Sequence, residues 1–244
     1  MFGVLLLHSL FSTDLEMREF AEYLESQGLK TSTPLLPGHG TDPSDLENYT
    51  YQDWIDAADS ALKKLNSECQ VTFIVGQITS AALALSLASS HPELLGIVIL
   101  SGLLTLTRKQ NIIKQALRFL PNILPWASER SELNHSEHTL TLMKNVKTYT
   151  KVPKKAIIEA DYLLTSTRKK LKQIIQPLYI MYSSLSKNVD QRNFQILLNE
   201  VNSPKKKFLS IGRGKSLMTL DEGRYIVFRE AASFFWSCID LYQM

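Results

Sequence analysis

The sequence predicts an α/β fold in which helices flank a mostly parallel central sheet, with a small helical cap inserted near the middle of the chain. Short apolar runs alternate with segments that carry apolar residues at helical spacing. The apolar runs are continuous, which is typical of parallel strands covered by helices on both faces. Strands that alternate with helices in this way favour a parallel sheet. Its functional edge is then expected at the carboxyl ends of the strands.

The first hundred residues supply the expected strands and helices in strict alternation. Gly28 is a favoured helix terminator, and the β-branched run before Gly76 predicts a strand that breaks at this glycine. The expected strands are Gly3 to Leu7, Leu29 to Pro34, Val71 to Val75 and Leu95 to Leu100, and the expected helices are Leu15 to Gln27, Tyr51 to Leu65 and Thr79 to Ser90.

The pattern changes in the middle of the chain, which we interpret as a cap inserted at about residues 103–160. Helical pieces there are punctuated by prolines and rich in Lys, Asn and Ser, with no convincing strand. After it we expect two more buried strands, Pro177 to Tyr182 and Lys207 to Ile211, and a final helix over Asp221 to Tyr242. The aromatic cluster of this helix (Phe234, Phe235 and Trp236) is expected in the core, although a final helix can also carry a homodimer face.

Composition limits the class of protein. At 244 residues and 44% hydrophobic content, residues 1–244 are expected to form one domain. A net charge of +3 is too small for a nucleic-acid-binding surface, so no nucleic-acid partner is expected. The apolar start lacks a positive region and a cleavage site, and no stretch reaches the length of a transmembrane segment. We therefore expect a cytoplasmic protein.

No metal or cofactor site is expected. Cys69 and Cys238 lie far apart, which gives neither a zinc signature nor a disulfide framework. His135 and His138 are three residues apart, but two ligands without a third indicate a solvated cap helix. The string GRGKS lacks the earlier glycine of a phosphate-binding loop, since Leu209 stands in its place.

The stretch VLLLHSLFSTDLEMREFAEYLESQGLKTSTPLLPGHGTDPSDLENYTYQDWIDAADSALKKL resembles the opening of bacterial carboxylesterases and monoacylglycerol lipases, and the similarity continues to SLMTLDEGRYIVFREAASFF. Its most specific part is the loop PGHGT with the helix that carries Trp54. The resemblance implies an α/β-hydrolase fold, a helical cap and a catalytic Ser, Asp and His.

The nucleophile position of this family is occupied by Ile78. In these enzymes the strand after the Trp helix ends in a GxSxG elbow, whose serine projects a hydroxyl into the pocket. The corresponding residues here are Gly76, Gln77, Ile78, Thr79 and Ser80. A hydrocarbon side chain cannot attack a carbonyl, so covalent catalysis at this position is excluded.

The other two triad positions also carry serines. The aspartate of the pattern HGxxDxxVP falls at Ser186, with Asp190 four residues later, and the histidine of SGHxxxLD falls at Ser216. Loss of one triad member can reduce turnover about a millionfold. We therefore expect a degenerate triad at Ile78, Ser186 and Ser216 and no serine-esterase activity by the usual route.

Substitution of these side chains leaves the backbone N–H donors of the site in place. The family serine sits at positive φ, which is a genuine outlier for a β-branched residue, so we expect the turn at Ile78 to relax. The N–H groups of Leu10 and Thr79 could still point at one spot and bind a carbonyl or carboxylate without reaction. The expected ligand-binding residues are Leu10, Phe11, Ile78 and Thr79.

These observations leave alternative functions open. The first is a non-catalytic homologue that binds an acyl or lipid-like molecule or a protein partner. The second is an active esterase with relocated groups, using Ser80 or Ser216 with His8 or His39, although hydroxyls without a matched base are weak nucleophiles. The interpretation we favour for His8 and His39 is structural, through hydrogen bonds within loops. A third possibility is a structural or regulatory subunit with a filled pocket.

Overall fold

A six-stranded parallel sheet forms the centre of the molecule. The computed structural model describes residues 1–105, 126–127, 152–184, 191–212 and 217–244. Neighbouring strands follow the order β2-β1-β3-β4-β7-β8, and every pairing between them is parallel. The strands are β1 (Phe2–Leu7), β2 (Lys30–Ser32), β3 (Val71–Gln77), β4 (Gly96–Leu100), β7 (Leu178–Ser183) and β8 (Lys206–Ile211).

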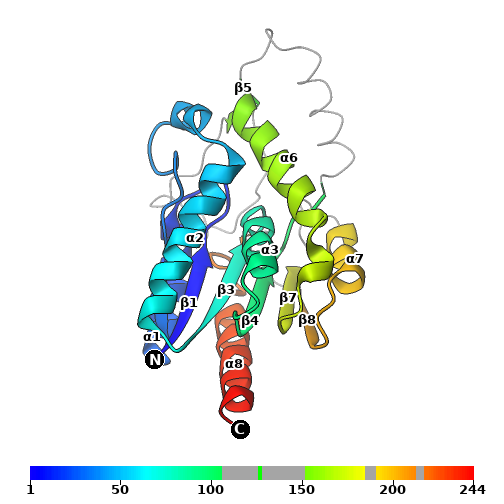
Figure 1. The fold of residues 1–244 in the computed structure, drawn as a ribbon. Helices are drawn as coiled ribbons and strands as arrows, with labels where there is room; N and C mark the ends of the chain where they lie inside the picture. Colours follow the sequence, from blue (N-terminus) through cyan, green and yellow to red (C-terminus); the bar gives the residue numbers. More distant parts are fainter. Residues whose placement is uncertain (106–125, 128–151, 185–190, 213–216) are drawn as a thin grey trace.

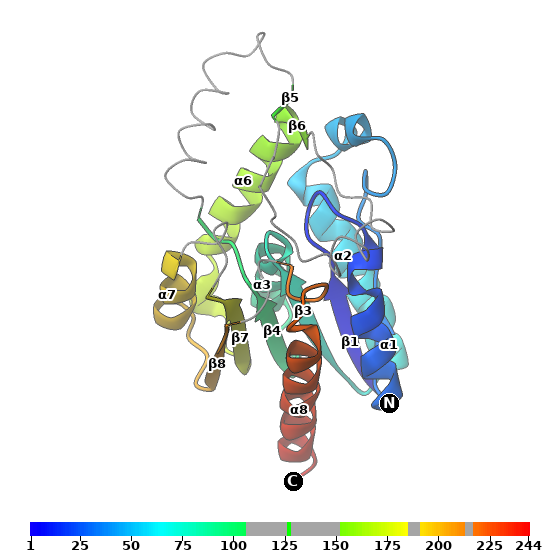
Figure 2. The same cartoon turned by 180° about the vertical axis from the view of Figure 1, so that it is seen from behind.

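Helices cover both faces of this sheet, as Figures 1 and 2 show from opposite sides. Alternate residues of β1 enter two separate core clusters: Leu5 and Leu7 pack with α2, α3 and α6, whereas Val4 and Leu6 pack with α1 and α8. This arrangement confirms the predicted α/β-hydrolase fold. The helices are α1 (Arg18–Ser26), α2 (Tyr51–Glu68), α3 (Ser80–Ser90), α6 (Lys154–Arg168), α7 (Gln191–Glu200) and α8 (Arg224–Gln243).

Phe234 and Phe235 of α8 lie in the core, as the sequence predicts, whereas Trp236 of the same cluster is only partly buried. Phe235 is fully buried, and its ring centroid lies 4.6 Å from that of Phe73 in β3. Phe234 is also buried and packs against Tyr179 of β7 at 5.5 Å. Burial of this face ties the last helix to three central strands, because Phe234 also approaches Gly96 of β4.

Three elements differ from the sequence prediction. β3 does not break at Gly76 but pairs with β4 as far as Gln77. β8 is an edge strand and not a buried one: most of its residues are partly or fully exposed, and Phe208 is 59% exposed. The sequence interpretation omitted α7, which lies beside the last two strands (Figure 2).

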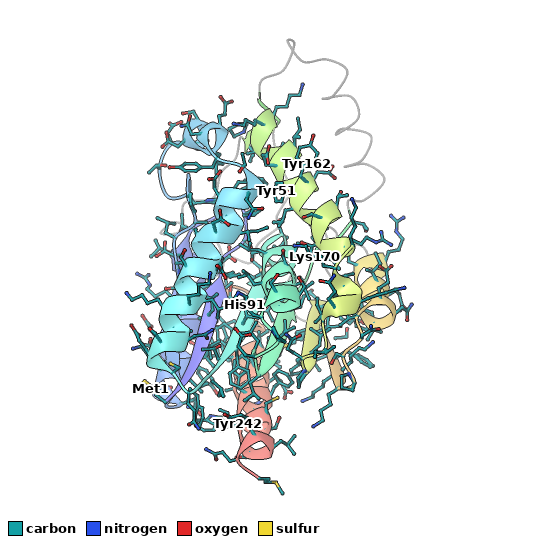
Figure 3. All side chains as sticks on the ribbon, viewed as in Figure 1. Met1, Tyr51, His91, Tyr162, Lys170 and Tyr242 are labelled. Carbon is teal, nitrogen blue, oxygen red and sulfur yellow. The ribbon has the colours of Figure 1, made fainter. Side chains whose placement is uncertain are left out.

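The expected cap falls largely outside the described residues, so its boundaries remain a prediction. The described parts of this region include two short antiparallel strands that were not expected, β5 (Trp126–Ala127) and β6 (Val152–Pro153). α6 begins inside the expected cap range and runs on to Arg168 along the sheet domain. Tyr162 of α6 lies near Tyr51 of α2, with ring centroids 6.4 Å apart (Figure 3).

Within the described ranges, no helix combines the length and the apolar character needed to cross a lipid bilayer.

Candidate functional site

The turn that joins β3 to α3 is a sharp elbow with Ile78 at its apex. Ile78 has φ 52°, which lies in the left-handed region that β-branched residues rarely adopt. The expectation that this turn would relax is therefore wrong. Ile78 N–H donates to Leu100 O at 2.9 Å, and Ile78 O accepts from Leu103 N–H at 2.9 Å. The end of β4 and the loop after it thus hold both sides of the strained residue.

Close packing of α3 against β3 prevents the backbone at Ile78 from relaxing to a negative φ. A Cβ at Gly76 would lie 2.5 Å from Ser80 O, so the first turn of α3 passes directly over the end of the strand. Gln77 N–H donates to Ser80 Oγ at 3.0 Å, and Ser80 Oγ lies 2.8 Å from Leu7 O. Backbone strain of the kind seen at Ile78, about 1–3 kcal/mol, persists only where surrounding contacts over-determine it.

The hydroxyl of Ser80 has a structural role in these contacts. It is fully buried, accepts from Gln77 N–H and lies within hydrogen-bond distance of Leu7 O and Gln77 O. Neither His8 nor His39 is among its partners. Ser80 therefore does not form the relocated nucleophile and base pair that the sequence left open.

Replacing Ser80 by Ala should lower the free energy of unfolding by about 1–3 kcal/mol, because Gln77 N–H would lose its acceptor in a buried place. Chemical denaturation of Ser80→Ala and wild type measures this difference. Ser90→Ala is the control, since Ser90 is exposed at the far end of the same helix. An unchanged stability of Ser80→Ala would contradict the structural role.

Two backbone N–H groups adjoin the elbow. Thr79 follows Ile78 and precedes the first turn of α3, and Leu10 lies in the loop after β1. Both residues are buried, at 8% and 4% exposure. Within residues that the structure describes, neither N–H makes a hydrogen bond to the protein. Both donors therefore remain available to an oxygen atom of a ligand.

The loop that carries Leu10 is held in an unusual conformation by a buried imidazole. Phe11 has φ 70°, and its N–H donates to His39 Nε2 at 3.3 Å. His39 Nδ1 lies 3.0 Å from Pro37 O, which fixes the proton on that nitrogen. Leu36 N–H similarly donates to His8 Nε2 at 3.2 Å. Both histidines therefore bind loop backbone, which confirms their predicted structural role.

Both imidazoles are kept neutral by their surroundings. Burial lowers the pKa of His8 to about 4. Burial, followed by the neighbouring His8, lowers the pKa of His39 to about 3. The two rings are 5.1 Å apart between centroids. With each Nε2 occupied as an acceptor, neither ring is placed to take a proton from a serine.

Hydrocarbon side chains pack around Ile78. It forms a small apolar cluster with Leu15, Leu217 and Leu220, of which Leu217 and Leu220 are buried. Leu217 directly follows the position at which the resemblance places the histidine, Ser216. Ser216, Ser186 and Asp190 all lie outside the described residues, as do His135 and His138. Among the residues described, no group of three His, Cys, Asp or Glu side chains is arranged to hold a metal ion.

Sequence reasoning missed a buried polar network behind the elbow. Glu16 is fully buried and accepts hydrogen bonds from Ser9 and from the side chain of Gln77, which in turn contacts Thr219. One signal was available: Gln77 follows a continuous apolar strand immediately before Ile78. A polar side chain at such a place must find a buried partner. The identity of that partner, seven residues after Ser9, depends on the tertiary fold.

Relatives with similar sequences and structures are lipases and esterases. The chain is 27% identical over 238 residues to a thermostable monoacylglycerol lipase from Bacillus sp. (strain H-257), which covers 96% of this chain and 90% of that enzyme. A structure from the metagenome-derived lipolytic enzymes LipS and LipT superposes with a TM-score of 0.87 and 25% identity, over 97% of this chain and 94% of the other.

A more distant neighbour has the same fold. The monoacylglycerol lipase of Paleococcus ferrophilus superposes with a TM-score of 0.82 and 16% identity, over 97% of this chain and 94% of that one. In addition, the family model for serine aminopeptidase S33 matches residues 3–214. This chain therefore belongs to the serine aminopeptidase S33 (Hydrolase_4) family and is an esterase- and monoacylglycerol-lipase-like α/β-hydrolase.

Proposed function

We propose that this protein is a catalytically inactive member of its family that binds an acyl or lipid-like molecule. The main support is Ile78, a hydrocarbon at the apex of the elbow, packed against Leu217 and Leu220. Its side chain has no lone pair for attack on a carbonyl carbon, and Ser80 is committed to the backbone. The relation to a monoacylglycerol lipase supports an acyl compound as the ligand class.

The backbone near the elbow can bind the polar end of such a ligand. The N–H groups of Leu10 and Thr79 supply two donors, and Thr79 stands at the N-terminus of the eleven-residue helix α3. Helix N-termini favour negative charge, and the first turn of α3 contains no acidic residue that would oppose it. A carboxylate or ester carbonyl bound here would be held by hydrogen bonds without a reaction.

We expect purified protein to hydrolyse p-nitrophenyl butyrate no faster than buffer. A fluorophosphonate probe should likewise form no adduct with a serine. The variant Ile78→Ser should also stay near background, because an added hydroxyl has no matched base in this proposal. Robust hydrolysis, or a labelled serine located by peptide mapping, would instead support the alternative of an active esterase with a relocated serine, for which Ser216 remains a candidate.

Binding is tested separately from hydrolysis. Addition of decanoate to the ¹⁵N-labelled protein should shift the amide resonances of Leu10 and Thr79, while 1-decanol, which lacks a carboxylate, should shift them less. Amide shifts confined to other surfaces would argue against this site. If no fatty-acid probe binds, the remaining possibility is a protein-binding or homodimeric role, which sedimentation of the purified protein would detect as self-association.

A further inference from the structure

A fully buried glutamate connects the segments that surround the elbow. Glu16 Oε1 accepts from Ser9 N–H at 3.0 Å, from Ser9 Oγ–H at 2.8 Å and from Gln77 Nε2 at 2.5 Å. Ser9 immediately precedes Leu10, and Gln77 immediately precedes Ile78. One carboxyl oxygen therefore joins the loop after β1 to the end of β3.

The same network reaches the segment before α8. Gln77 Nε2 donates to Thr219 Oγ1 at 3.0 Å, and Thr219 N–H donates to Gln77 Oε1 at 3.2 Å. Thr219 lies between Leu217 and Leu220, the two buried leucines that pack on Ile78. Glu16 and Gln77 thus position three chain segments that meet at the elbow.

Among the described residues, no positive charge compensates Glu16. Its hydrogen-bond donors are the neutral groups of Ser9 and Gln77, and no ion pair of the described residues includes it. His8, the titratable side chain of β1 and the loop after it (residues 2–13), is neutral because burial lowers its pKa to about 4. A buried carboxylate without a cation or a full set of donors is strongly disfavoured.

The second carboxyl oxygen of Glu16, Oε2, accepts no hydrogen bond. Glu16 Oε2 is buried and has no hydrogen-bond partner, and the hydroxyls of Ser12 and Thr13 in the same turn are also buried without partners. A carboxylate has no proton to give, whereas a carboxylic acid can donate from Oε2 to a hydroxyl oxygen. As placed, an ionised Oε2 would be a buried charged oxygen that receives no hydrogen bond, whereas a protonated Oε2 is neutral.

We infer that Glu16 is a neutral carboxylic acid at neutral pH and acts as the positioning residue for the backbone donors of Leu10 and Thr79. This inference deepens the proposed ligand-binding function and rests on it only for its effect on affinity. Burial raises the pKa of the Glu16 carboxyl, in agreement with the geometry, although the neighbouring Ser12 hydroxyl and the hydrogen bonds from Ser9 and Gln77 act in the opposite direction. Ionised Glu16 would place a negative charge beside Leu10 and repel a bound carboxylate.

Carboxyl NMR tests the protonation directly, without a ligand. In wild-type protein labelled with ¹³C at the glutamate side-chain carboxyl, one resonance should have the shift of a protonated acid at pH 7, and Glu16→Gln should lack it. Glu22→Gln is the matched control, because Glu22 is exposed on α1. If every glutamate resonance titrates in the ordinary range of about 4–5, the inference is wrong. This result needs only the wild-type protein, so it stands even if Glu16→Gln does not fold.

Stability against pH gives a second measurement. Between the unfolded pKa, about 4.3, and the raised folded pKa, the native state holds one more proton than the unfolded chain, so the Glu16 contribution to stability should fall as pH rises. Glu16→Gln should lose this slope and Glu22→Gln should keep it. Equal slopes in wild type and Glu16→Gln would overturn the inference.

The effect on binding uses decanoate as the probe. From about pH 6 to about pH 9, the Kd of wild type should rise roughly tenfold, whereas that of Glu16→Gln should stay constant. A constant wild-type Kd would remove the proposed control of affinity by Glu16. If decanoate fails to bind at any pH, the proposed function fails, and the carboxyl resonance still decides the protonation of Glu16.

Discussion

Below pH 6.5 the folded protein should lose several kcal/mol of stability, because His8 and His39 are buried as neutral acceptors. Their pKa values are lowered by burial to about 4 and about 3, so the unfolded chain binds protons first as the pH falls. The stabilisation is fully present above about pH 6.5 and is lost as the pH falls toward the two folded pKa values. Each pH unit of separation corresponds to about 1.4 kcal/mol. Denaturant unfolding at a series of pH values measures this loss.

The geometry specifies the control variants for this experiment. Glutamine can present an oxygen in place of Nε2 and does not titrate, so His8→Gln and His39→Gln should unfold with a weaker dependence on acid. His91→Gln should leave the loss in place, because His91 is partly exposed between Asp59 and Glu93. A wild-type stability that stays constant between pH 6.5 and pH 4 would show that these imidazoles are not buried as described.

Much of the fold could be predicted because strands that are buried on both faces are recognisable in the sequence as continuous apolar runs. The continuous apolar runs of β1, β3 and β4 predicted strands with both faces covered, and all three are fully or almost fully buried. β8 was predicted to be buried because the pattern of apolar residues does not distinguish an edge strand from a central one. Its place at the edge depends on the order of the strands in the folded sheet. α7 was omitted although its residues have a clear amphipathic pattern with Leu197 buried.

The site was predictable only where a motif fixes the backbone. The sequence placed Ile78 at the elbow, and the structure does so too. The predicted relaxation failed because it considered only the local preference of isoleucine, whereas contacts from Leu100, Leu103 and Ser80 determine the turn. Glu16 could not be assigned a role, since nothing in its helical neighbours indicates that it faces Gln77, sixty-one residues away.

Substitution of Gly76 by Ala should destabilise the protein by about 3 kcal/mol. A Cβ at this position would overlap Ser80 O at 2.5 Å and crowd Ala81 Cα and Ala84 Cβ, each at 2.8 Å. The first of these contacts is with backbone, so rotation of a side chain cannot relieve it. α3 would have to move away from β3, which would also displace Thr79 N–H at the start of this helix.

The matched control is Gly212→Ala, since among the described atoms nothing lies within 4 Å of a Cβ added at Gly212. Denaturant unfolding should separate the two variants clearly, and the decanoate-induced shift of the Thr79 amide should weaken only in Gly76→Ala. Equal stabilities would mean that α3 does not press on the strand. If Gly76→Ala is destabilised but still binds decanoate normally, ligand binding does not depend on the packing of the elbow. The backbone donors would then be independent of the position of α3.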